Sequence, residues 1–154
     1  MGAAGLIVFL VIQFLHPIAA DPPRTSGVSL FATNAPPAEV AQLLRAACYN
    51  CHADDTQWPW YAKIAPVSWW LTDHVNHGRR RMNFSDWPQD DSRRAARRWR
   101  SIASVVESSE MPLPSYTWMH PEARLSAAQR SRIVDWARNE ADRLQPSNSE
   151  KESP

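Results

Sequence analysis

Apolar residues recur at intervals of three and four positions in several stretches between residues 37 and 144, and this spacing predicts amphipathic α-helices. No stretch shows the strict alternation of apolar and polar residues that predicts a half-buried β-strand. The predicted helices run from about Ala38 to Cys48, from Pro66 to Gly78, from Asp91 or Ser92 to Ser108, and from Ser126 to Leu144. We therefore predict an all-α fold.

Each predicted helix has its apolar residues on one face. These faces are Val40, Leu43, Leu44 and Ala47; Val67, Trp70, Leu71, His74 and Val75; Ala95, Ala96, Trp99, Ile102, Ala103 and Val106; and Ile133, Trp136, Ala137 and Leu144. Ser126 and Gln129 match the capping-box pattern at a helix start. Gly78 is of the type that commonly follows the last turn of a helix.

The N-terminal residues 3–15 carry no charge and are strongly apolar. A buried helix has the same composition, but a position ahead of a proline-rich stretch favours an export segment. A cleaved signal peptide has basic residues before its apolar core, whereas no Lys or Arg precedes Arg24. An uncleaved anchor needs about 20 apolar residues, which residues 2–20 nearly provide. We therefore favour a single N-terminal anchor, with the rest of the chain outside the cytoplasm.

These features divide the chain into an anchor or signal segment (1–20), a linker (21–36), a compact domain (37–144) and a disordered tail (145–154). The net charge of +1 over 154 residues argues against nucleic acid as the main partner. The 8 Trp and 13 Pro indicate a small core padded by aromatic rings. A large apolar cofactor would help to complete the core of a domain this small.

The chemistry of the chain centres on the sequence Cys48-Tyr49-Asn50-Cys51-His52. Two thiols at this spacing can add to the two vinyl groups of haem, and the adjacent histidine is then held under the iron as an axial ligand. A zinc site usually needs four ligands, and no second Cys or His pair occurs at finger spacing. A thioredoxin-like redox pair would lie in a βαβ pattern, which is absent from the sequence pattern. The motif therefore predicts one covalently bound haem c on Cys48 and Cys51, with His52 on the iron.

Met111 is the leading candidate for the second axial ligand. It lies in Met111-Pro112-Leu113-Pro114, between two predicted helices, where a proline-stiffened loop can direct a thioether at the iron. Met111 is alternatively a gap-filling core residue. His74 is the second candidate, although its position on an apolar helix face is also that of an ordinary core histidine. Met82, Met119, His77 and His120 are further candidates.

With both axial positions filled, we expect one-electron transfer without substrate binding, because a His/Met pair supports electron carriage and raises the potential. With an open or weakly held sixth position, the protein would be a gas sensor or a peroxidase-like enzyme. His74 would then be the distal acid–base group and Arg79 a stabiliser of bound oxygen. A third possibility is a structural subunit whose haem only stabilises the fold.

Positive charge is concentrated in residues 79–100, which contain 8 Arg and 3 Asp. This stretch is either a solvated helix face or a docking surface for an acidic redox protein, membrane-bound or soluble. Arg79 to Arg81 could also pair with haem propionates. The aromatic residues that follow the cysteine motif form either a wall around the porphyrin or ordinary core packing. They are Trp58, Trp60, Tyr61, Trp69 and Trp70.

A helix followed by Cys-x-x-Cys-His, a Met-Pro loop and a C-terminal helix resembles a class I cytochrome c. The fuller resemblance, over about Pro36 to Arg143, is to the small haem-binding domain family of bacterial proteins. The resembling stretches include Trp58-Pro59-Trp60-Tyr61, Ala65-Pro66-Val67-Ser68-Trp69-Trp70, Asp73-His74, Asn83-Phe84-Ser85-Asp86-Trp87, Glu110-Met111-Pro112-Leu113, Tyr116 and His120-Pro121-Glu122-Ala123-Arg124-Leu125-Ser126. This resemblance implies covalent haem and an N-terminal membrane segment, and hence a haem domain at the bacterial inner membrane, in the periplasm or otherwise outside the cytoplasm. It does not distinguish His74, Met111 and His120 as ligands.

Overall fold

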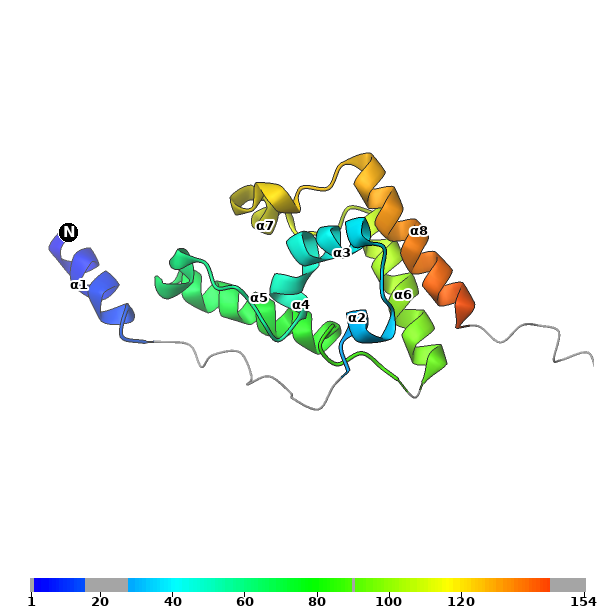
Figure 1. Cartoon of the computed structure of the whole chain (residues 1–154). Coiled ribbons are helices and arrows are strands. Elements are labelled where there is room, and N and C mark those ends of the chain that lie inside the picture. The colour runs from blue at the N-terminus through cyan, green and yellow to red at the C-terminus, as the bar shows by residue number, and fades with distance from the viewer. Residues whose placement is uncertain (1, 16–27, 90, 145–154) are drawn as a thin grey trace, which may run out of the picture.

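The computed structural model describes residues 2–15, 28–89 and 91–144 (Figure 1). These ranges contain helices and connecting turns and no strand, so the predicted all-α fold is confirmed. The α-helices are α1 (Gly2–Ile12), α2 (Leu30–Thr33), α3 (Ala38–Leu44), α4 (Asn50–His52), α5 (Val67–Arg81), α6 (Ser92–Glu107), α7 (Pro114–Met119) and α8 (Ala127–Arg143). The helical turns η1 (Arg45–Tyr49), η2 (Trp60–Lys63) and η3 (Pro121–Ala123) connect them.

Helices α6 and α8 pack side by side at one side of the domain, on the right in Figure 1. The whole predicted apolar face of α6 is buried, and so are Ile133, Trp136 and Ala137 of α8. Local signals define the starts of both helices, because the Asp91 side chain accepts from the Arg94 N–H and Ser126 forms its capping box with Gln129. Both helices therefore begin where the sequence predicts.

Helix α3 leads directly into the cysteine motif. The chain stays helical from Ala38 to His52, but residues 45–49 form a π-helical turn before α4 begins at Asn50. Turns of this kind are rare and frequently lie at functional sites. The predicted helix ending at Cys48 thus continues to His52, and the motif is part of the helical path.

Helix α5 ends at Arg81, three residues after the predicted end at Gly78. A Cβ atom at residue 78 would lie 2.8 Å from the carbonyl oxygen of Cys51, a distance at which one of the two helices would have to move. Glycine is therefore required inside α5 for its close approach to α4, and it does not mark the helix end.

The predicted apolar face of α5 is only partly buried. Val75 is 1% exposed, whereas Val67 and Trp70 are 41% and 47% exposed. Ser68 and Thr72 are buried instead, at 5% and 8%. The outer part of this apolar face lines a cavity, which is described below.

The N-terminal helix α1 covers eleven apolar or small residues and ends at Ile12. In the described part of the chain, no helix has both the length and the apolar character needed to cross a membrane. The predicted spanning anchor is therefore not supported by α1, and residues 16–20 of that prediction lie outside the described residues. Gln13, just after α1, exchanges hydrogen bonds with both backbone groups of Ala65, at 3.1 and 2.9 Å.

The residues preceding α3 contribute to the domain. Leu30 is 0% exposed and belongs to the core, although it lies in the stretch predicted as a linker. Its N–H donates to the carbonyl oxygen of Phe84 at 2.7 Å. Residues 21–27 of that linker and the predicted tail at 145–154 lie outside the described residues.

Candidate functional site

Two cavities that share part of their lining adjoin the cysteine motif. Their volumes are about 410 and about 580 Å³, within the range of ligand sites. Helices α4, α5 and α7 and the loop at residues 111–113 supply their walls. Both cavities are lined by Cys51, His74, Leu113 and Tyr116. The smaller cavity adds His52 and Met111 to this set, and the larger one adds mostly apolar and aromatic side chains.

The two cysteines are free thiols three positions apart on the helical path. Cys51 lines both cavities, while Cys48 packs against the hydrophobic core. Burial raises the pKa of the Cys48 thiol to about 12. Burial also raises the pKa of Cys51, and the nearby Arg79 charge partly opposes this shift. Both groups are therefore protonated thiols at neutral pH.

One ring nitrogen of His52 is hydrogen-bonded to the backbone. Its Nδ1 lies 2.9 Å from the carbonyl oxygen of Met82, and its ring stacks on Phe84 with 5.5 Å between centroids. Burial lowers the pKa of His52, and the backbone carbonyl oxygens of Met82 and Gly78 only partly oppose this shift, so the neutral imidazole is favoured. Because a carbonyl oxygen can only accept, Nδ1 carries the proton and Nε2 keeps its lone pair. This is the usual arrangement of a metal-binding histidine, whose other nitrogen donates to the backbone.

Arg79 stabilises the loop that follows His52. Its guanidinium donates to the carbonyl oxygens of Ala53 and Asp54, at 2.9 and 3.2 Å, and to the hydroxyl of Thr56 at 2.8 Å. It is not among the residues that line either cavity. This placement disfavours the predicted roles of Arg79 as a propionate partner or a stabiliser of bound oxygen.

The backbone N–H and carbonyl groups of Met111 are both hydrogen-bonded. Its N–H donates to the carbonyl oxygen of Val105 at 3.0 Å, and its own carbonyl oxygen accepts from Arg130 at 3.1 Å. Ser109 makes the turn out of α6 with a φ of 65°, in the left-handed region. These contacts fix the loop that brings Met111 to the same cavity as His52.

His74 has a backbone anchor like that of His52. Its Nδ1 lies 2.8 Å from the carbonyl oxygen of Trp70, and the two rings lie against each other at 4.1 Å. Its Nε2 is therefore also available for a ligand. His52, Met111 and His74 all line the smaller cavity, so the two leading candidates for the sixth ligand lie beside the motif.

His120 is engaged at both ring nitrogens. Its Nε2 lies 2.9 Å from the Tyr61 hydroxyl, and its Nδ1 lies 3.0 Å from a carboxylate oxygen of Glu122. An imidazole held in this way has no free lone pair for iron. The structure therefore disfavours His120 as an axial ligand.

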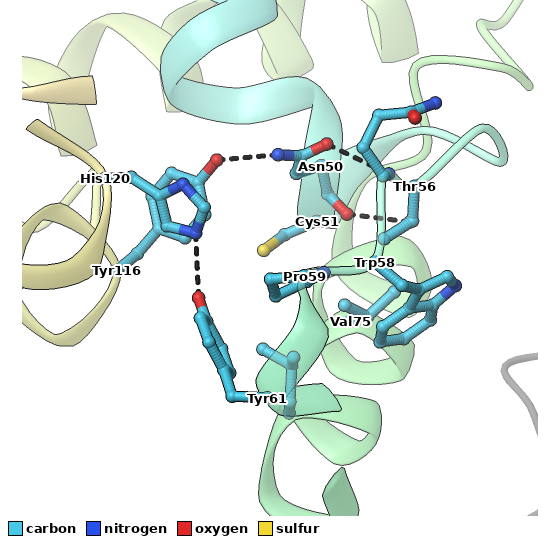
Figure 2. Close-up of a pocket in the computed structure, with 11 residues that line it drawn as sticks. Asn50, Cys51, Thr56, Trp58, Pro59, Tyr61, Val75, Tyr116 and His120 are labelled. Atoms are coloured by element: carbon cyan, nitrogen blue, oxygen red, sulfur yellow. Dashed lines mark hydrogen bonds between the residues drawn. The ribbon is translucent and has the colours of Figure 1, made fainter. Parts of the chain in front are cut away.

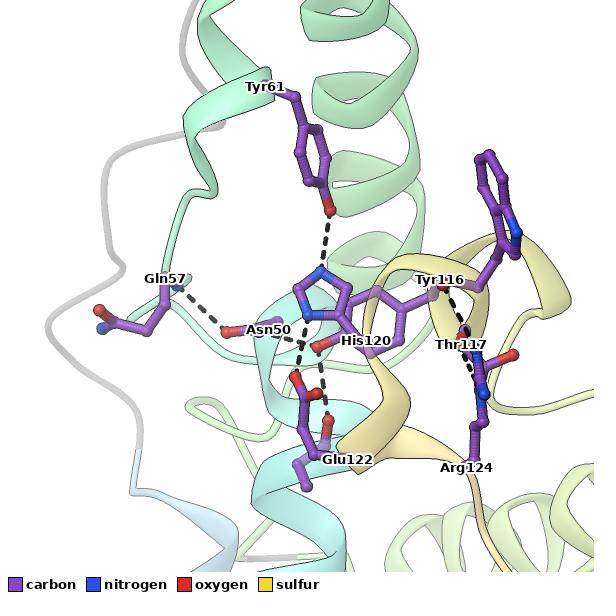
Figure 3. A network of polar contacts seen from close by, with 10 residues as sticks. Asn50, Gln57, Tyr61, Tyr116, Thr117, His120, Glu122 and Arg124 are labelled. Carbon is purple, nitrogen blue, oxygen red and sulfur yellow. Dashed lines mark hydrogen bonds and ion pairs between the residues drawn. The ribbon is translucent and has the colours of Figure 1, made fainter.

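A polar network next to Cys51 was not anticipated from the sequence (Figures 2 and 3). The Asn50 side chain donates to the Tyr116 hydroxyl at 2.8 Å and accepts from the Gln57 N–H at 3.2 Å. The Tyr116 ring stacks on His120 with 4.2 Å between centroids. Asn50 and Tyr116 are 66 positions apart in the sequence, so no local pattern could have revealed the bond that joins the two halves of this network.

The aromatic residues that follow the motif differ in their roles. Tyr61 and Trp70 line the larger cavity, as the cofactor-wall interpretation predicts. Trp69 donates its indole N–H to the carbonyl oxygen of Leu15 at 2.7 Å. Trp60 is 72% exposed. Trp118 of α7, which was not singled out in the sequence, completes the aromatic wall of the larger cavity.

The residues that line the two cavities fit a haem in their donor groups and in their apolar character. A thiol and a histidine with a free Nε2 lie beside a cavity with apolar and aromatic walls, and a thioether and a second imidazole line the same space. The sequence matches the family model described as a haem-binding domain over residues 7–139. No curated protein and no solved structure gives a significant match.

Proposed function

The chain belongs to the haem-binding domain family, and from this premise we propose that it is a c-type cytochrome that transfers single electrons. One haem per chain would be bound through thioethers to Cys48 and Cys51. The observation that carries the proposal is the hydrogen bond of His52. Its Nδ1 donates to the Met82 carbonyl oxygen, so its Nε2 could bind the iron. Bound haem would supply a one-electron couple at its iron.

The residues of the chain would hold this group in one position and keep water away from it. His52 would hold the iron of this group through Nε2, with its tautomer and ring angle set by Met82 and Phe84. Met111 is our preferred second ligand, because its backbone N–H and carbonyl oxygen are both hydrogen-bonded. Trp70, Trp118 and Tyr61 would supply apolar and aromatic walls around the group.

Electrons would be exchanged with an acidic redox protein. His77 lines the smaller cavity, and its Nε2 accepts from Arg81 at 3.4 Å, so positive charge lies at the cavity rim. Arg80 and Arg81, in the last turn of α5, are exposed. Charge of one sign near the cofactor would steer an acidic partner into a productive encounter.

We also propose that the domain acts outside the cytoplasm. The apolar helix α1, whose large side chains are mostly exposed, supports export, as does the thioether attachment proposed here. Mass spectrometry of protein purified from a cell fraction would show whether the N-terminal segment is retained or removed.

The test of the proposal begins with denatured protein. Haem that stays with the chain on a denaturing gel, and is lost when Cys48 and Cys51 are replaced by Ala, would establish covalent attachment. The long-wavelength spectrum of the ferric protein would then identify the ligand. A weak sulfur-to-iron charge-transfer band, lost in Met111→Ala and kept in His74→Ala, supports His52/Met111 ligation. A low-spin spectrum without this band assigns the position to His74.

His74 also supports a second candidate function. Its free Nε2 in the shared cavity could serve as an acid–base group toward a small molecule on an open iron site, as in a gas sensor or a peroxidase-like enzyme. Rapid binding of carbon monoxide to the ferrous protein at neutral pH would favour this function over simple electron transfer.

A further inference from the structure

The helical turn η2 and the residue after it form an exposed surface outside the two cavities at the cysteine motif. Trp60 is 72% exposed and Ile64 is 36% exposed, and neither side chain lines those cavities. Lys63 lies next to Ile64 in the sequence and is also exposed. We call Trp60, Lys63 and Ile64 the η2 surface. It is separate from the apolar walls that would face a haem.

The N-terminal helix α1 is joined to this surface by hydrogen bonds. The side-chain amide of Gln13, one residue after α1, donates to the carbonyl oxygen of Ala65 at 3.1 Å and accepts from the Ala65 N–H at 2.9 Å. The indole N–H of Trp69 donates to the carbonyl oxygen of Leu15 at 2.7 Å. Figure 1 shows α1 next to the end of α5 at which that helix begins. Because Ala65 directly follows Ile64, α1 and the η2 surface adjoin.

Helix α1 itself indicates the surroundings of this part of the molecule. Its sequence contains no polar or charged side chain, and the described structure buries none of its residues. The six large apolar side chains from Leu6 to Val11 are between 42% and 61% exposed. A helix that is apolar all round needs an apolar environment, either a protein core or a lipid bilayer. Since the described part of the domain does not enclose α1, lipid is the environment that fits.

The charges along the sequence at the η2 surface match an anionic lipid surface. Lys63 is the one charged residue between Thr56 and Thr72, and residues 2–15 carry no charge. These two stretches therefore bring no carboxylate that would repel lipid phosphates. Trp is enriched at membrane–water interfaces, where its ring lies among the headgroups. A lysine can place its stem on an apolar surface and its ammonium in the polar layer.

We propose that the η2 surface binds an anionic lipid bilayer, with Trp60 and Ile64 at the level of the headgroups and Lys63 against lipid phosphates. The domain would then rest on the bilayer in one orientation, next to α1. This lipid contact goes beyond the proposed electron transfer and does not depend on bound haem.

The lipid contact would leave the other end of α5 open to a redox partner. Helix α5 begins close to the η2 surface and has 15 residues, and its last turn carries Arg80 and Arg81. At a rise of about 1.5 Å per residue, these arginines would lie up to roughly 20 Å from the lipid. Lipid and an acidic redox protein could therefore bind the same molecule together.

The lysines of the sequence, Lys63 and Lys151, allow a direct test. The full-length haem protein would be added to vesicles of phosphatidylcholine and phosphatidylglycerol, recovered with the vesicles by flotation, and acetylated with an N-hydroxysuccinimide ester. Mass spectrometry would follow each lysine. Relative to Lys151, we expect vesicles to slow the acetylation of Lys63 roughly fivefold, the factor by which anionic headgroups hold one lysine at a membrane surface. A ratio that vesicles leave unchanged, or a chain that does not float, would overturn the proposal.

Trp60→Ser combined with Ile64→Ser tests whether the η2 surface makes the contact. Both side chains are exposed, so the variant should keep the helix content of the wild type by circular dichroism, and vesicles should no longer slow the acetylation of Lys63. Val28→Ser is the matched control. It shortens a side chain that is 44% exposed elsewhere on the domain, where the Val28 carbonyl oxygen accepts from the Trp87 N–H, and it should keep the full protection. Protection of Lys63 in the double variant as strong as in the wild type would overturn the proposal.

A second copy of the chain on the η2 surface would give a different result. Lys63 would then be protected without vesicles, and sedimentation would show a dimer, which would overturn the proposal. The haem content and spectrum of the same samples keep the two proposals apart. A chain without haem that shows the vesicle effect contradicts the proposed function alone, whereas a reversibly reduced haem protein without the vesicle effect contradicts the lipid contact alone.

Discussion

Gly78 of α5 lies so close to α4 that a Cβ atom on it would come within 2.8 Å of the Cys51 carbonyl oxygen. Because the atom it would meet is backbone, no side-chain rotation can relieve the clash. Contact at this point joins the helix that carries His74 to the one that carries Cys51 and His52.

Gly78→Ala should therefore destabilise the protein, although alanine is the better helix former. We expect a loss of about 1–3 kcal/mol in the free energy of unfolding, typical of overpacking. Denaturant unfolding of the purified protein measures it. Gly5→Ala is the control, since nothing lies within 4 Å of its added methyl group. Equal stability of the two variants would mean that α4 and α5 can separate freely.

Arg130 should affect iron ligation by Met111, which we propose above, through the backbone of the Met111 loop. Its Nη1 donates to the carbonyl oxygens of Val106 and Met111, at 2.7 and 3.1 Å, and so ties the Met111 loop to α8. Arg130→Ala should weaken the sulfur-to-iron charge-transfer band and speed carbon monoxide binding, because the loop loses its anchor. Arg132→Ala, which removes an exposed pair with Glu39, should change neither property. A charge-transfer band of full strength in Arg130→Ala would show that the hydrogen bonds of Arg130 are not needed for ligation by Met111.

The thiol of Cys48 should be unreactive in the folded, haem-free chain. Its pKa is about 12 instead of 9.0, so at pH 9 the thiolate fraction is about one in a thousand, against one half for an exposed thiol. Iodoacetamide at pH 9 should label Cys48 slowly, and denaturant should remove the protection, as mass spectrometry of its peptide would show. The raised pKa also means that the contribution of this thiol to stability is complete below pH 9 and is lost as pH rises toward 12. Fast labelling without denaturant would contradict the burial of Cys48.

Charge at the cavity rim should control the reaction with anionic partners. Arg80→Glu combined with Arg81→Glu should slow oxidation of the ferrous protein by ferricyanide, on the order of tenfold at low ionic strength. Added salt should reduce the difference, because screening weakens steering. The pair Arg93→Glu and Arg97→Glu changes the net charge equally on α6 and is the matched control. Equal slowing by both pairs would indicate net charge, rather than charge at the rim, as the cause.

Elements with local signals were predictable from the sequence. Helix α6 has both an N-cap and a complete apolar face, and all six residues of that face are buried. The capping box of Ser126 likewise defined the start of α8. The Cys-x-x-Cys-His motif is local as well, which is why its chemistry could be inferred before its geometry was known.

Features that depend on distant contacts were not predictable. Gly78 has the residue type of a helix end, but its role is set by Cys51 on another helix. The apolar face of α5 suggested core packing, whereas Trp70 and His74 line a cavity. His120 could be named as a ligand candidate only while its hydrogen bonds to Tyr61 and Glu122 were unknown.

The half-exposed apolar face of α5 has a consequence for the stability of the protein in the cell. In a molecule without bound haem, this face of α5 would form an exposed hydrophobic patch together with Trp118 and Met119, which are 77% and 45% exposed. Such molecules are natural targets for chaperones and proteases. Cofactor supply would thus set the abundance of the protein, since chains completed without haem would be removed before they accumulate.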